Sequence, residues 1–200
     1  MGVDAVAFEF LKCRVNNYIT LNDQEILDIS KYFEVCSFSK NQFLLKEGHI
    51  CDFWGFIQQG LVRSYSLTGD GDEYTLGCMY EGSFISESLS FSQRSPSLVN
   101  VHALEDTVLI CISYAKLQEL YIKYPIFEKI ARMLYEERLA SVKARILYRV
   151  QLSATERYIH FINTQPELIK RVPLKYIASY LNITDSTLSR IRRKISRMKV

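Results

Sequence analysis

Hydrophobic and polar residues alternate with different periods in successive regions of this 200-residue chain. Ile26, Ile29 and Phe33 recur at helical spacing after Asn22, and Glu25 stands three residues beyond Asn22. This is the capping-box arrangement, so the pattern predicts a helix that begins at Asn22. Between residues 35 and 112, short apolar runs are broken by turn residues and glycines, as in antiparallel strands of a β-barrel or jelly roll. The "GDGD" at 69–72 lacks the ligand spacing of a calcium loop and predicts a hairpin turn.

A second helical pattern begins at Tyr114 and predicts one long helix over residues 125–150. Pro125 suits its first turn, and no glycine or proline interrupts the later turns. The apolar positions form a stripe close to coiled-coil spacing, interrupted by Glu137: Ile126, Ile130, Met133, Leu134, Ala140, Ala144 and Leu147. Two interpretations fit this stripe: a core helix packed on its own barrel, or a spacer that pairs with a second copy of the chain.

Two short helices joined by a tight turn are predicted near the end of the sequence. Pro173 begins the first, and its apolar residues share one face at i, i+3, i+4 and i+7: Leu174, Ile177, Ala178 and Leu181. Asn182 suits the left-handed residue that ends that helix, and Thr184 is a natural N-cap for the next. Such a pair is a helix-turn-helix.

The final helix separates apolar from polar residues when its positions are phased at about 100° per residue. Leu188, Ile191 and Ile195 fall on one side, opposite small hydroxyls and arginines. The predicted base-contacting residues are Asp185, Ser186, Ser189 and Arg190. The predicted phosphate-contacting residues are Lys175, Thr184, Arg192, Arg193, Lys194 and Arg197. One alternative is a membrane-surface helix, although the apolar side is narrow for that role. The other is a plain solvated helix, although the polar side has few acids for it.

The charge distribution strengthens the nucleic-acid interpretation. Residues 138–200 carry 14 Lys/Arg against 3 Asp/Glu, whereas the first 137 residues carry 11 against 19. A basic segment attached to an acidic one suggests two parts, of which the C-terminal part faces a polyanion. No apolar run reaches the length of a membrane span. The five cysteines are odd in number and lack CxxC spacing, which favours reduced thiols in a cytoplasmic protein and argues against a disulfide framework or a metal site.

Together these patterns predict an α+β chain with three parts. Residues 1–124 form a β-barrel or jelly-roll sensor domain, residues 125–150 a long dimerisation helix, and residues 151–200 a (winged) helix-turn-helix domain. The glycine-punctuated "FLLKEGHICDFWGFIQQG" and the C-terminal "RVPLKYIASYLNITDSTLSRIRRK" resemble the Crp/Fnr family of bacterial transcription regulators, the latter in its Bacteroidetes-type form. The resemblance implies a homodimer on a pseudo-palindromic double-stranded operator, with half-sites ~34 Å apart. The resemblance also allows RNA polymerase as a partner. It does not imply a membrane partner.

The same resemblance points to an effector pocket. Members that bind cyclic nucleotides hold the ribose with a Gly-Glu pair and the phosphate with an Arg-Ser pair. Here Ser86 and Glu87 stand at the first pair, and Ser97 and Leu98 at the second. Without the arginine a buried phosphate lacks its charge-assisted partner, so we expect no cyclic AMP and assign no cofactor. Arg94 is out of register and is expected to be solvated. In the recognition helix Ser186 replaces the family's usual glutamate, so the half-site sequence is open.

No catalytic motif is present: the sequence lacks HExxH, GxSxG and a glycine-rich phosphate loop, so no enzyme activity or catalytic residue is expected. The alternative function is a small-ligand-binding module whose basic C-terminal helix contacts RNA or membrane.

Overall fold

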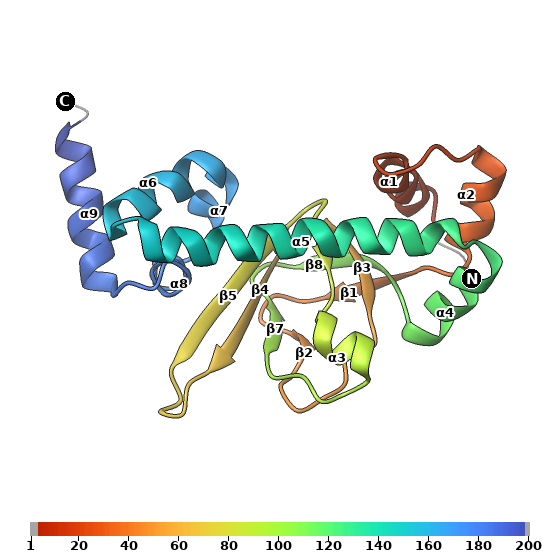
Figure 1. The fold of residues 1–200 in the computed structure, drawn as a ribbon, viewed down its shortest axis with the longest axis horizontal. Coiled ribbons are helices and arrows are strands. Elements are labelled where there is room, and N and C mark those ends of the chain that lie inside the picture. Colours follow the sequence, from red (N-terminus) through yellow and green to blue (C-terminus); the bar gives the residue numbers. More distant parts are fainter. Residues whose placement is uncertain (1–3, 199–200) are drawn as a thin grey trace.

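Two sheets pack against one side of a long helix in this chain, as a computed structural model of residues 4–198 shows (Figure 1). The first three residues of the predicted sensor segment and the last two of the predicted DNA-binding segment therefore lie outside the described residues. The helices are α1 Ala5–Asn16, α2 Asp23–Ser30, α3 Ser88–Gln93, α4 Tyr114–Lys123, α5 Ile126–Gln151, α6 Ala154–Thr164, α7 Pro166–Arg171, α8 Leu174–Tyr180 and α9 Asp185–Met198. The strands are β1 Glu34–Phe38, β2 Phe43–Leu45, β3 Trp54–Gln59, β4 Leu61–Leu67, β5 Glu73–Tyr80, β6 Phe84–Ile85, β7 Asn100–Ala103 and β8 Thr107–Ile112.

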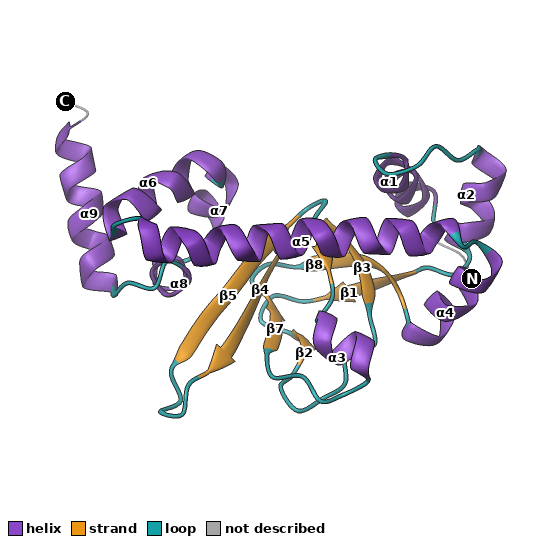
Figure 2. Ribbon diagram, in the orientation of Figure 1, coloured by secondary structure: helices purple, strands orange, loops and turns teal. Residues whose placement is uncertain are grey.

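The strands form two four-stranded antiparallel sheets, in the orders β1-β8-β3-β6 and β2-β7-β4-β5. This is a jelly-roll-like arrangement of two sheets, and of the two predicted alternatives the closed barrel is wrong (Figure 2). The hairpin between β4 and β5 confirms the predicted turn, since Thr68 accepts from Gly71 N and donates from its own N–H to Asp72 O. Gly71 has φ +85° there, a conformation that favours glycine. The capping box of Asn22 and Glu25 is also present.

One hydrophobic core joins the sheets to the N-terminal half of α5. Trp54 and Leu109 of the sheets, Leu11 of α1, and Ile130 and Leu134 of α5 are all at most 4% exposed. No sequence pattern indicated α1, whose buried face consists of only three residues. α5 is thus held by the sensor along its first turns.

The two interpretations of the long helix each hold for one part of α5. Ile130 and Leu134 of the predicted stripe are buried in the chain's own core. In the first half of α5 the stripe therefore packs on the sensor, and the prediction that it faces a second copy is wrong for that half. In the second half, Leu147 of the predicted stripe is 44% exposed. The most exposed large apolar residues there are Leu139, Ile146 and Val150, which are 69%, 55% and 82% exposed. They lie seven and four residues apart and thus share one side of the helix. We call these three residues the α5 seam.

Four helices come after α5 and pack on a second core. Their buried side chains meet two leucines of the sensor, Leu61 of β4 and Leu104 just after β7. Between residue 113 and residue 198 the described chain contains helices only, so that segment has no wing. Figure 1 shows α6–α9 at the C-terminal end of α5, and α1, α2 and α4 at its N-terminal end. Across residues 4–198, no helix combines the length and the apolar character that crossing a membrane needs.

Candidate nucleic-acid interface

The turn between α8 and α9 has the predicted chemistry. Asn182 adopts the left-handed conformation with φ +55°, and Ile183 N donates to Ala178 O at 3.0 Å. These are the features of a helix C-cap that needs a residue tolerant of positive φ. Thr184 then caps α9, since its Oγ1 accepts from Thr187 N at 3.2 Å. The local sequence therefore sets the angle at which α9 leaves α8.

One side of α9 is buried and fixes the orientation of the other. Leu188 and Ile191 are 2% and 6% exposed, and they belong to the same core as Ile177 and Ala178 of α8, each 1% exposed. Ala178 leaves room for this close crossing. Ile195 is partly buried against the same core. The predicted apolar side is confirmed for these residues, while Met198, which helical spacing puts on the same side, has its side chain outside the described part of the structure.

The opposite side of α9 is exposed and carries the predicted contact residues. All four predicted base-contacting residues and all six predicted phosphate-contacting residues are exposed to solvent. Arg190 lies close to the helix, with Nη2 donating to Thr187 Oγ1 at 3.3 Å. Four cations surround a shallow hollow of about 330 Å³: Arg190, Arg193, Lys194 and Arg197.

The positive charge of this surface is not neutralised by nearby acids. Within residues 4–198, no carboxylate lies within 4.0 Å of a cation of α9 or of Lys175. The acid of the helix itself, Asp185, is in the first turn, where its negative charge interacts favourably with the helix dipole. It is two turns or more away from Arg193 and Arg197. Such a face attracts a polyanion and, with hydroxyls at its N-terminal end, can also donate and accept hydrogen bonds.

Polar contacts that the sequence did not reveal hold the C-terminal helices on the sensor. Arg171, at the end of α7, pairs with Glu81 at 2.7 Å and with Glu105 at 2.6 Å. Hydrogen bonds from Arg171 lower the pKa of Glu81 to about 2, and the two acids raise the pKa of Arg171. These three residues are far apart in the sequence and carry no motif, so only the fold brings them together.

A second contact of this kind is made by Arg63 of β4, which is fully buried. Its guanidinium lies 3.7 Å from the ring centroid of Tyr176 in α8 and pairs with Glu73 at 2.5 Å. The Ser179 hydroxyl of α8 accepts from Thr75 N at 2.8 Å and donates to Glu73 O at 3.1 Å, both in the backbone of the same hairpin. The hairpin β4–β5 and the helix-turn-helix are therefore packed as neighbours.

Two of the four predicted effector residues, Glu87 and Ser97, are hydrogen-bonded within the chain itself. The Glu87 carboxylate caps α3 by accepting from Ser90 N at 2.7 Å. Ser97 is buried and its hydroxyl bonds both the N–H and the carbonyl of Val99, whereas Leu98 is 68% exposed. Ser86 Oγ is buried beside the Tyr135 phenol of α5, whose pKa burial raises. The structure does not bring these four residues together around one open space.

Arg94, expected to be solvated, makes specific contacts, so that expectation is wrong. It pairs with Asp52 at 2.9 Å, donates to Cys51 O at 2.8 Å and lies 4.6 Å from the Tyr114 ring centroid. Its backbone has φ +53° at the C-cap of α3, which turns the side chain toward these partners. Arg94 is therefore committed to structural contacts and does not replace the missing phosphate-binding arginine.

A cavity of about 520 Å³ lies elsewhere, between α5, β5 and the C-terminal helices. Its cations are Arg14, Arg138 and Arg145, and Tyr180 of α8 closes one side. Two acids, Glu81 and Glu137, also line it. None of the four predicted effector residues does.

Comparison with known proteins finds similarity to a domain family over part of the chain and to individual proteins over most of it. Residues 35–124 match the cyclic nucleotide-binding domain family. The chain is similar to the fumarate and nitrate reduction regulatory protein of Escherichia coli (strain K12), with 27% identity over 184 residues that cover 86% of this chain and 73% of the relative.

Two solved structures share the fold. FixK2 from Bradyrhizobium japonicum has a TM-score of 0.71 at 17% identity, covering 84% of this chain and 86% of its own. A structure from Eubacterium rectale, described as a candidate transcriptional regulator of the crp/fnr family, has a TM-score of 0.68 at 19% identity, covering 91% of this chain and 88% of its own. The sensor sheets, the long helix and the C-terminal helices thus occur together in other proteins.

Proposed function

We propose that this chain is a transcription regulator of the Crp/Fnr family, and that it acts as follows. Two copies pair through α5 and place two α9 helices in successive major grooves of a pseudo-palindromic operator. One observation carries the proposal: the exposed face of α9 presents cations free of acids within the described chain, on a helix whose other face is fixed in a core. This is the arrangement that a recognition helix requires.

The contacts divide into two groups by their place on the helix. Ser186, Ser189 and Arg190, with Asp185, lie toward the N-terminal end of α9 and would meet base edges. Arg190 suits a bidentate pair with guanine O6 and N7. Lys175, Thr184 and the cations further along α9 would meet phosphate and set the register. Because Ser186 forms weaker and less selective base contacts than a carboxylate, the half-site is expected to be read mainly by Arg190.

The α5 seam supports a homodimer. Its three large apolar side chains are more than half exposed and lie on the side of α5 away from the sensor core. Burying such a patch against a partner is favourable in water. A second copy of the same seam supplies such a partner with the two-fold symmetry of a palindromic operator. RNA polymerase would be a further partner at a promoter, and the free thiols suit a cytoplasmic location.

The sensor is proposed not to bind cyclic AMP in the usual manner. Glu87 and Ser97 already bond the chain, and Arg94 is held by Asp52 and Cys51. A cyclic phosphate in this region would therefore lack a free guanidinium.

RNA or membrane binding by α9 is the competing function. Membrane binding is disfavoured because Leu188 and Ile191, the apolar residues that would enter the lipid, are at most 6% exposed. Single-stranded RNA binding commonly uses exposed aromatic platforms, and the sequence of α9 has no aromatic residue.

The test is protein–DNA binding measured against salt, on duplexes recovered by footprinting the purified protein on genomic DNA. If a dimer neutralises about ten phosphates, log K falls with log salt at a slope of roughly −9. Single-stranded RNA of the same length and anionic vesicles serve as competitors, and we expect neither to displace the duplex. A flat salt response, or displacement by RNA or vesicles at lower concentration than by unlabelled operator, would reject the proposal.

A further inference from the structure

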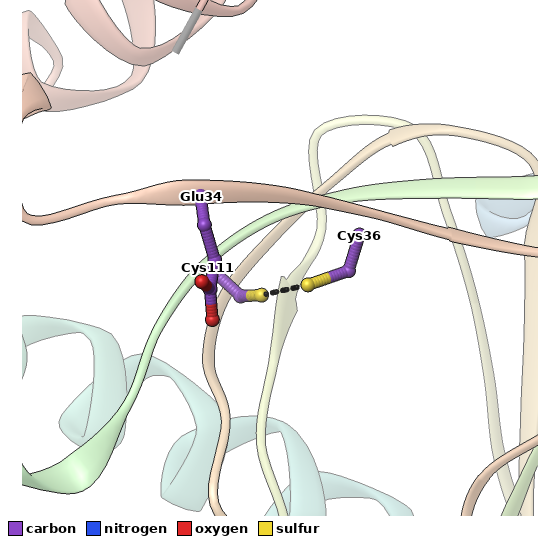
Figure 3. A group of neighbouring side chains, drawn as sticks. All are labelled: Glu34, Cys36 and Cys111. Carbon is purple, nitrogen blue, oxygen red and sulfur yellow. Dashed lines mark hydrogen bonds between the residues drawn. The ribbon is translucent and has the colours of Figure 1, made fainter. Parts of the chain in front are cut away.

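Two cysteines on neighbouring strands have their sulfur atoms in contact. Cys36 on the edge strand β1 and Cys111 on β8 have Sγ atoms 3.0 Å apart (Figure 3). In the strand register Cys36 lies opposite Leu109 and Cys111 opposite Glu34, so both thiols are on the same face of the sheet as diagonal neighbours. Neither DNA binding nor dimerisation uses this pair.

The two thiols differ in exposure and acidity. Cys36 is partly exposed, whereas Cys111 is 3% exposed. The hydrogen bond from Cys111 lowers the pKa of Cys36, and the same hydrogen bond together with burial raises the pKa of Cys111. The nearby charges oppose each other: Glu34 disfavours the Cys36 thiolate and Lys116 of α4 favours it, while Lys116 and Glu34 lie 3.7 Å apart. An accessible sulfur of thiolate character with a protonated thiol directly behind it is the arrangement of an attacking and a resolving cysteine.

We infer that Cys36 and Cys111 form an oxidation site that takes a hydroperoxide and becomes a disulfide. The Cys36 thiolate attacks one peroxide oxygen, the O–O bond breaks, and hydroxide leaves while Cys36 becomes a sulfenic acid. Cys111 sulfur then attacks Cys36 sulfur, the S–O bond breaks, and the leaving hydroxide takes the Cys111 proton as water. Overall, two thiols and one hydrogen peroxide give one disulfide and two water molecules, with two electrons passing from sulfur to oxygen.

The fold permits the small movement that this reaction needs. The sulfurs must approach from 3.0 Å to about 2.05 Å. β1 is at the edge of its sheet and pairs with β8 alone, so it can shift without breaking a second ladder. The reaction therefore requires no separation of core strands.

A metal site is the alternative that this cluster raises, because Glu34 lies within 4.8 Å of both sulfurs. Tetrahedral zinc, with Zn–S of about 2.3 Å, holds two thiolates roughly 3.7 Å apart and takes four ligands. The sulfurs here are closer than that, and the part of the chain that the structure describes offers three ligands at this place. Disulfide formation fits the geometry better.

The bond would link distant parts of the sensor. It closes a loop across 75 sequence positions, and β8 leads directly into α4 and then into α5. Oxidation would thus fix β1 to the strand from which the long helix departs.

The experiment treats the reduced, full-length protein with hydrogen peroxide and maps its peptides by mass spectrometry without reduction. We expect one intramolecular peptide pair that joins Cys36 to Cys111, loss of two titratable thiols, and full reversal by a dithiol reductant. Thermal unfolding should shift upward by roughly 10 °C, because the cross-link restricts the unfolded chain.

Matched variants separate the two roles. In Cys111→Ser, Cys36 should accumulate as a sulfenic acid that a cyclic 1,3-diketone traps, whereas in Cys36→Ser the buried Cys111 should remain reduced. Cys13→Ser, which removes an exposed cysteine with no neighbouring thiol in the described chain, should leave the linked peptide unchanged. Absence of the linked peptide, preferential oxidation of Cys13, or one tightly bound zinc per chain in the purified protein would overturn the inference. The mapping of the unaltered protein needs no variant and does not involve DNA, so its result is independent of the proposed function.

Discussion

The α5 seam gives a quantitative expectation for dimerisation. Leu139 is 69% exposed in the single chain, and full burial of a leucine is worth about 1.5–3 kcal/mol. Covering the exposed part by a second copy therefore contributes about 1–2 kcal/mol for each Leu139. A symmetric dimer contains two of them, so Leu139→Ala should weaken dimerisation by about 2–4 kcal/mol, or roughly 30- to 1000-fold in the dissociation constant.

Sedimentation velocity over a dilution series measures this constant. Ile122→Ala is the matched control, because Ile122 is 83% exposed but lies on α4, outside the seam. That variant should dimerise like the unaltered protein and unfold at nearly the same temperature, since its side chain is not in a core. An unchanged dissociation constant for Leu139→Ala, or an equal loss for Ile122→Ala, would refute the seam as the dimer surface.

The interdomain ion pair, the turn before α9 and the sensor pocket each give a further expectation. Arg171→Ala removes the partner that lowers the pKa of Glu81 to about 2. Because the pKa of Glu81 is lower in the folded protein, the ion pair stabilises the fold fully above pH 4.5, near the unfolded pKa, and this stabilisation is lost as the pH falls toward 2. It should amount to about 1 kcal/mol, since the Glu81 side chain is 39% exposed and solvent screens the pair. Acid unfolding should therefore begin at higher pH in Arg171→Ala than in the control Lys170→Ala, which removes an exposed ion pair of the same helix, and identical acid limbs would contradict this. Asn182→Val should destabilise by about 1–2 kcal/mol in denaturant unfolding because it forces a β-branched residue to φ +55°, whereas Asn182→Gly should be neutral or stabilising; equal losses would exclude the backbone explanation. Calorimetric titration with cyclic AMP should give no binding heat, and a micromolar isotherm would contradict the proposed loss of the phosphate site at Ser97.

The elements of this chain were predictable from sequence where local chemistry decides them. Asn182 and Thr184 act within four residues of the groups they cap, and Asn22 does the same at α2. The apolar side of α9 is set in the same way by helical spacing. In each case the physical cause lies within one or two turns of the chain.

The joint between sensor and C-terminal helices was not predictable in this way. Arg171 meets Glu81 and Glu105 across 90 and 66 sequence positions, and Arg63 reaches Tyr176 from another element. The long helix was predicted only in part for a related reason: its apolar residues serve two neighbours in turn, and periodicity alone does not say which neighbour each one faces. The contacts of Arg94 were not predictable because its left-handed backbone, which directs the side chain inward, is unusual for arginine.

The central claim is that α9 reads DNA bases with Arg190 while its other cations hold phosphate. Fluorescence anisotropy with the footprinted operator and with a random duplex of equal length tests it directly. Arg190→Ala should lose about 1–3 kcal/mol on the operator and little on the random duplex. Lys194→Ala should weaken both duplexes alike and reduce the salt slope by about 1 for each subunit. Equal losses on both duplexes for Arg190→Ala would contradict base reading by this residue and reduce Arg190 to one more phosphate contact.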